Sequence, residues 1–93
     1  MKILGLDYTI AYKQQKEMDS VGLMNPMTLQ ITISADADIQ MKISILLHEI
    51  IEGVNSRLEL GMKESQIVGL EAGLYSVLKE NGIDISSLLP ENK

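Results

Sequence analysis

The chain of 93 residues contains no cysteine, tryptophan or phenylalanine, and its only aromatic residues are three tyrosines. Without cysteine it can form neither a disulfide framework nor a thiolate metal site, a composition that suits a reducing compartment. With so few aromatic side chains it lacks a stacking platform for single-stranded nucleic acid. The composition therefore leaves carboxylates and the single histidine as the groups available for chemistry.

Positive charge is also scarce, since 8 Lys and Arg stand against 13 Asp and Glu, for a net charge of −5. Nucleic-acid affinity rests largely on clustered cations, so we expect no nucleic-acid partner. No stretch of about 18 uncharged apolar residues is present, and no apolar run of signal-peptide length precedes Asp7. We expect a single domain over residues 1–93, located in the cytoplasm, with no membrane partner.

The first third of the chain predicts strands, over about residues 2–34. In "LDYTIAY" the residues Tyr8, Ile10 and Tyr12 alternate with small ones, which is typical of a half-buried strand. The stretch "VGLMNPMTLQITIS" predicts a hairpin with its turn at Asn25 and Pro26.

Two helices are predicted after the hairpin, the first over about 37–60 and the second over about 64–81, with Gly61 and Gly82 as stop signals. The short tail that follows is expected to fray at its end. This order of elements predicts an α+β fold, in which a small antiparallel sheet of about three strands is followed by two helices packed on one face.

The stretch "ISILLHEIIEGVN" lies within the first predicted helix. At helical spacing one side of this helix is apolar and is expected to face the sheet; its members are Ile39, Ile43, Leu46, Leu47, Ile50, Ile51, Val54 and Leu58. The opposite side carries His48 and Glu52, four residues apart, whose side chains can converge on one point. Such a stripe is also what any solvent-facing helix side presents, so solvation and metal binding both remain open.

The second helix contributes an independent signal. Glu71 falls within the apolar arc of this helix instead of opposite it. A carboxylate on a buried face is costly unless it is paired, hydrogen-bonded or bound to a metal. Two interpretations stay open: Glu71 snorkels outward or accepts hydrogen bonds from Tyr8 or Tyr12, or it joins His48 and Glu52 at a metal site.

With these residues in place, the chain resembles the minimal zincin scaffold of gluzincin metallopeptidases, the minigluzincins. Residues 44–81, with the pattern "LLHEIIE" followed by "LEAGLYSVLK", also resemble short phage and prophage proteins, which would place the chain in a host bacterial cytoplasm. The resemblance implies that His48 is the first metal ligand, Glu49 the general base and Glu71 the third ligand. Glu52 stands where that family has its second ligand, a histidine.

This departure bears on activity. Zinc favours nitrogen and sulfur donors, and a set of one histidine and two carboxylates neutralises more of the ion's charge and makes its bound water less acidic. Such a site favours manganese or iron, or loosely held zinc, or stays without a metal. Our leading interpretation is therefore a catalytically silent binding module that modulates a host protein, and the alternative is a divalent-metal-dependent peptidase or hydrolase.

The resemblance also implies how a partner would bind. In zincins an extended peptide pairs with an edge strand beside the active-site helix, and here one strand of the predicted hairpin would take that position. The partner would be an unidentified protein or peptide. Alternatively, the edge pairs with its own copy in a homodimer, or the tail around residues 83–89 covers it.

Overall fold

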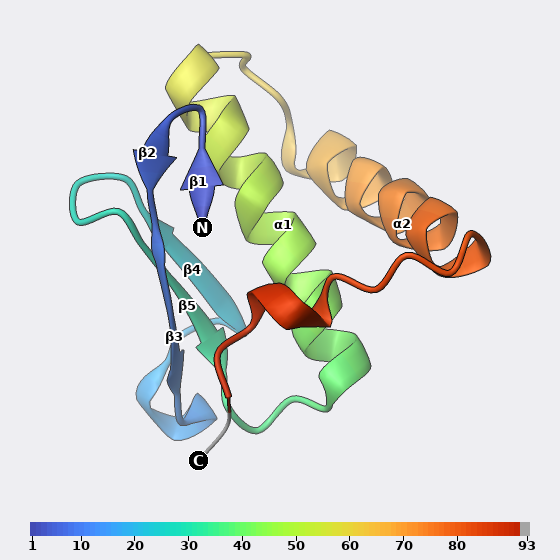
Figure 1. Ribbon diagram of the computed structural model, residues 1–93. Coiled ribbons are helices and arrows are strands. Elements are labelled where there is room, and N and C mark those ends of the chain that lie inside the picture. Colours follow the sequence, from blue (N-terminus) through green and yellow to red (C-terminus); the bar gives the residue numbers. More distant parts are fainter. Residues whose placement is uncertain (92–93) are drawn as a thin grey trace.

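The computed structural model describes residues 1–91 and has the predicted α+β fold (Figure 1). Its larger sheet has three strands in the order β3 (Thr9–Lys13), β5 (Gln30–Ser34) and β4 (Gly22–Asn25). Strands β4 and β5 form the predicted antiparallel hairpin. At its turn the Asn25 side chain accepts hydrogen bonds from the backbone amides of Met27 and Thr28.

The prediction of an antiparallel sheet is wrong for one of its two pairings, because β3 and β5 run parallel. After β3 the chain passes through a short 3-10 turn, η1 (Gln15–Glu17), and β4 forms at a distance from β3. The return strand β5 then fills the central position between the two. It therefore runs opposite to β4 and in the same direction as β3.

A second, two-stranded sheet at the start of the chain was not expected as a separate element. Strands β1 (Lys2–Ile3) and β2 (Leu6–Asp7) pair antiparallel across a turn in which Leu4 and Gly5 both have positive φ, at 50° and 83°. This turn type suits glycine, which adopts such φ without steric cost. The hairpin brings Ile3 into the core.

Helix α1 (Ile39–Leu58) covers the three-stranded sheet and supplies the centre of the core. Asp38 caps its first turn by accepting a hydrogen bond from the amide of Met41, and Glu59 ends it in the left-handed conformation. Ile31, Ile33 and Leu46 are fully buried where the helix meets the sheet.

The prediction of which α1 residues are covered is wrong at some positions. Ile39 and Leu58, at its ends, are more than half exposed, whereas Ile45 and Glu49 are buried. Strand β4 packs beside the helix and covers Ile45 and Glu49. Helical periodicity alone would place these two residues next to the polar side of the helix. The helix thus has two covered sides, one on the sheet and one on the second helix.

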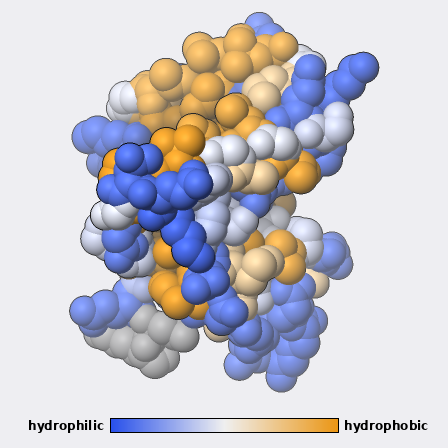
Figure 2. All heavy atoms as spheres, turned by 90° about the vertical axis from the view of Figure 1, so that its right-hand side faces the viewer, coloured by the Kyte–Doolittle hydropathy of each residue, from blue (hydrophilic) through white to orange (hydrophobic). Residues whose placement is uncertain are grey.

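Helix α2 (Glu64–Glu80) packs on α1 and stands away from the sheet, which corrects the prediction of two helices on one sheet face (Figure 1). Ile67 is its one buried residue. Several of its large apolar side chains are exposed: Val68, Leu70, Leu74 and Val77. Figure 2 shows the molecule from the side on which α2 lies, and apolar side chains gather over the upper part of that face.

The tail is better anchored than predicted. It forms a 3-10 turn, η2 (Ser86–Leu88), and Ile85 and Leu89 pack against the core. The Tyr12 hydroxyl donates a hydrogen bond to the carbonyl of Pro90 at 2.8 Å. The expected fraying of the last residues concerns positions 92–93, outside the described residues. No helix within residues 1–91 is long and apolar enough to cross a membrane.

Candidate metal centre

His48, in the middle of α1, has a different carboxylate partner at each ring nitrogen. Its Nδ1 lies 2.8 Å from Oε1 of Glu71, which reaches across from α2. The other oxygen of Glu71 accepts a hydrogen bond from the hydroxyl of Ser44. Glu71 is thus held at both oxygens, and it fixes the orientation of the imidazole.

The opposite nitrogen, Nε2, faces two further carboxylates. It lies 3.2 Å from Oε1 of Glu64 and 3.8 Å from Oε1 of Glu52. One donor atom from each of the three residues lies within 4.8 Å of the other two. Donors about 2.1 Å from a tetrahedral ion lie about 3.4 Å from one another. His48, Glu52 and Glu64 therefore fit as ligands of one divalent cation after small side-chain adjustments.

The residues predicted from the sequence meet at this place, with a different division of roles. His48 and Glu52 belong to the group of three donors, and Glu71 faces His48 as expected from its inward position. Glu71 lies on Nδ1, however, where it orients the ring, and the third donor on the Nε2 side is Glu64. Sequence reasoning missed Glu64, although it precedes Glu71 by seven residues and so shares its side of the helix.

Glu49, the predicted general base, is buried beside this group. Its side chain packs against β4 at Gly22, where an added Cβ would lie 2.9 Å from Oε2 of Glu49. Glu49 is 7% exposed as a residue, and its carboxylate lies at the wall of an open cleft. Burial, reinforced by Glu52, Glu64 and Glu71 and opposed by His48, raises the pKa of Glu49 to about 7.

The other groups of the site respond to the same crowding of negative charge. Burial by itself would lower the pKa of His48, but the hydrogen bond to Glu71 and the charges of Glu49, Glu64 and Glu71 raise it above its ordinary value. Burial and the proximity of Glu64 raise the pKa of Glu52. A bound cation would relieve this repulsion, and without one the carboxylates compete for protons.

A cleft of about 360 Å³ opens from these residues toward the edge strand β4. Its wall on the α1 and α2 side includes His48, Glu49, Glu64 and Glu71, and its opposite wall is formed by residues 20–22. A neighbouring hollow continues the same wall to Met24. Within residues 1–91 strand β4 pairs with β5 alone, so one strand of the hairpin presents a free edge beside His48, as expected, and the described part of the tail packs against the core.

Neither a family model nor a curated protein nor a solved structure matches this chain. The geometry of the site therefore carries the functional argument by itself.

Proposed function

We propose that this protein binds one divalent cation through Nε2 of His48 and the carboxylates of Glu52 and Glu64, on a zincin-like scaffold. The observation that carries the proposal is that the two ring nitrogens of His48 have different partners. Glu71 contacts Nδ1, and the carboxylates of Glu52 and Glu64 lie beside Nε2. A metal-ligating histidine usually donates its other ring N–H to a carboxylate, and Glu71 supplies that partner. The hardness of two carboxylate donors favours manganese, iron or loosely bound zinc.

The buried carboxylate of Glu49 is a second, independent reason to infer a site here. Burial of a carboxylate costs free energy, and carboxyl groups with a raised pKa in a cleft concentrate where a protein handles protons or ions. Burial raises the pKa of Glu49 to about 7 in the cation-free protein, and a cation bound beside it would favour the ionised form, which is the form that accepts a proton. The bound cation would supply Lewis acidity, and Glu49 would take the proton of a water molecule positioned in the cleft.

The substrate class that suits this cleft is an extended peptide. The free edge of β4 offers backbone N–H and C=O groups for strand pairing along the cleft. Gly22, the first residue of β4, lies against Glu49, so a peptide paired with this strand would pass the general base. We therefore propose divalent-metal-dependent hydrolysis of a peptide or a related amide as the activity.

The second candidate is a binding module without catalysis, which our sequence analysis favoured. The ligand set itself favours it, because two carboxylates on one ion reduce the acidity of its bound water. Both candidates use the same cation and the same strand edge, and they differ in whether the peptide is cleaved.

A direct experiment separates them. The protein loaded with Mn²⁺, Fe²⁺ or Zn²⁺ is incubated with a library of unstructured peptides, and cleavage is followed by mass spectrometry alongside the Glu49→Gln variant. The hydrolase proposal requires cleavage by the wild type that Glu49→Gln reduces by at least about 100-fold. Peptide binding that is equal in both proteins and never followed by cleavage would establish the binding module instead.

A further inference from the structure

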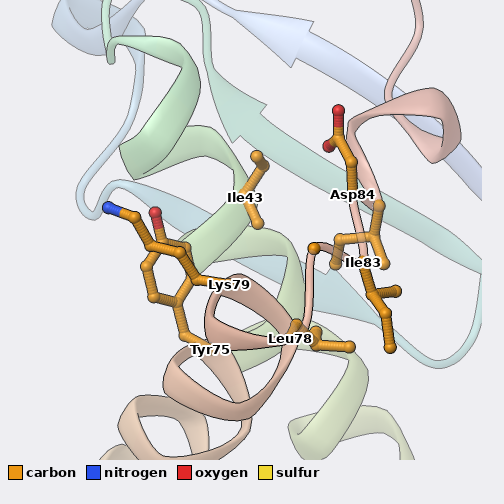
Figure 3. Close-up of a pocket in the computed structure, with 8 residues that line it drawn as sticks. Ile43, Tyr75, Leu78, Lys79, Ile83 and Asp84 are labelled. Atoms are coloured by element: carbon orange, nitrogen blue, oxygen red, sulfur yellow. The ribbon is translucent and has the colours of Figure 1, made fainter.

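The interface between α1 and α2 includes the polar residues of the candidate metal centre and leaves much of α2 exposed. Of the 17 residues of α2, Ile67 is the one that is buried, at 2% exposure. Toward the C-terminal end of α2 the two helices and the tail line a partly open pocket of about 240 Å³ (Figure 3). Its apolar lining residues are Ile43, Tyr75, Leu78, Ile83 and Ile85.

This pocket is partly open to solvent, so the side chains of α1, α2 and the tail that line it do not pack against one another across it. In Figure 3 Ile43 of α1 and Leu78 of α2 stand on different walls of the pocket, with Ile83 of the tail on a third. Much of the apolar surface of α2 also points to solvent, so the hydrophobic contribution to its docking is small for a helix of this length.

At the N-terminal half of α2 the polar contacts between the two helices are short, but most of the groups that make them are acidic. Helix α1 contributes His48 and Glu52 and α2 contributes Glu64 and Glu71, with Glu49 buried close by. One imidazolium offsets at most one of the three carboxylates of Glu52, Glu64 and Glu71, and neither Lys nor Arg lines the cleft among the described residues. Without further positive charge, the acidic groups of the two helices repel one another.

The connection between the helices has the features of a hinge. Glu59 and Gly61 both have positive φ, at 51° and 67°, and the connecting residues are mostly exposed. The connection is tied to α1 by hydrogen bonds from the amides of Leu60 and Met62 to the backbone and side chain of Asn55. Glu59 and Gly61 are therefore the positions about which α2 would rotate once its contacts with α1 are lost.

From these contacts we infer that the divalent cation controls the docking of α2 on α1. This inference rests on the proposed cation site, and it adds that the cation is a switch for one helix as well as a cofactor. The cation would hold Glu64 of α2 together with His48 and Glu52 of α1, so its binding would stabilise the contact between the two helices. The cation-free protein keeps its sheet and α1 folded, while α2 opens locally.

Hydrogen exchange measured by mass spectrometry, with and without Mn²⁺ or Zn²⁺, tests the inference. At free cation 100 times the dissociation constant, linkage predicts about 100-fold slower exchange for amides whose opening releases the ion. We expect this change in residues 64–80 and little change in β5 and the sheet-facing amides of α1. The Glu64→Gln variant should lose the response, and Glu80→Gln, whose partner is Ser76 on the same helix, should keep it.

Calorimetric titration of the same samples shows whether a negative result concerns the cation site itself or its control of α2. If no cation binds, the proposed function fails and this inference fails with it. If one cation binds and the slowing is equal in α2, α1 and the sheet, or absent from α2, the site stands and the inference that it controls α2 is overturned.

Discussion

Glu71 of α2 contacts Nδ1 of His48 at 2.8 Å, and this contact decides which side of the imidazole can meet a cation. The Nδ1 edge is closed by a carboxylate that Ser44 also holds, so the open donor is Nε2. Glu64 and Glu52 lie on that side. We therefore propose that Glu71 positions the imidazole ring and that Glu64 binds the cation.

Removing the charge of Glu64 should weaken cation binding more than removing the charge of Glu71. Replacing a residue that orients a ligand typically costs about 10–100-fold in metal affinity, which is the loss we expect for Glu71→Gln. Loss of a ligand carboxylate in Glu64→Gln should exceed it. Calorimetric titration of both variants against Glu80→Gln checks this. An order of affinities with Glu71→Gln weakest would return Glu71 to the ligand position that the resemblance implied.

Glu52→Ala should leave the stability of the metal-free protein almost unchanged and should remove the stability that the cation adds. Glu52 is half-buried and its contact with His48 is 3.8 Å, so in chelator its loss should change the free energy of unfolding by less than about 0.5 kcal/mol. For the wild type, cation at 100 times the dissociation constant adds about 2.7 kcal/mol. Melting curves in chelator and in excess cation measure both quantities. A variant that melts at the same raised temperature as the wild type in excess cation would remove Glu52 from the site.

The stability of the metal-free protein should fall as the pH rises through the range from about 4.5 to about 7. Burial raises the pKa of Glu49 from 4.5 to about 7, so the folded state binds a proton in this window that the unfolded state releases. The cost is complete above the higher value and amounts to roughly 3 kcal/mol.

Glu49→Gln keeps the shape of the side chain and cannot ionise, so it should be more stable than the wild type at pH 8 and should lose this part of the pH dependence. Urea unfolding in chelator from pH 4 to pH 8 provides the measurement. Parallel profiles for the two proteins would show that Glu49 is not desolvated in the folded state.

Gly22 should not tolerate a methyl group. A Cβ at this position would lie 2.5 Å from Cγ2 of Ile45 and 2.9 Å from Oε2 of Glu49, so β4 and α1 would have to separate. We expect Gly22→Ala to destabilise the protein by about 1–3 kcal/mol. Gly69→Ala is the matched control, because its Cβ meets nothing within 4 Å and alanine favours the helix by roughly 0.5–1 kcal/mol. Chemical unfolding measures the stability of both variants. Equal stabilities would contradict the close approach of β4 to α1.

The sequence predicted those parts of the molecule that depend on local patterns. The hairpin turn at Asn25 and the existence of both helices follow from turn chemistry, hydrophobic period and glycine stop signals. The helices extend over Ile39–Leu58 and Glu64–Glu80, within two residues of the expected ends. The parallel pairing of β3 with β5 was missed, since it depends on where a distant strand inserts, which no local pattern encodes.

The same distinction holds for the candidate site. The spacing of His48 and Glu52 fixes their convergence, and the inward position of Glu71 is visible as a carboxylate within an apolar arc. Which nitrogen of His48 each carboxylate meets depends on how α2 is placed along α1. That placement brings Glu64 to Nε2, and it follows from the connection at residues 59–63 and the anchoring of Ile67. The burial of Glu49 likewise depends on β4, a different element.

The most direct test of the central claim is elemental analysis of the protein purified without a chelator or an affinity tag, followed by titration with Mn²⁺, Fe²⁺ and Zn²⁺. We expect one divalent ion per chain at saturation, with binding much weaker in Glu64→Gln and unchanged in Glu80→Gln. Wild-type protein that binds none of the three ions, or that binds them as well after Glu64→Gln, would contradict a metal centre at His48, Glu52 and Glu64.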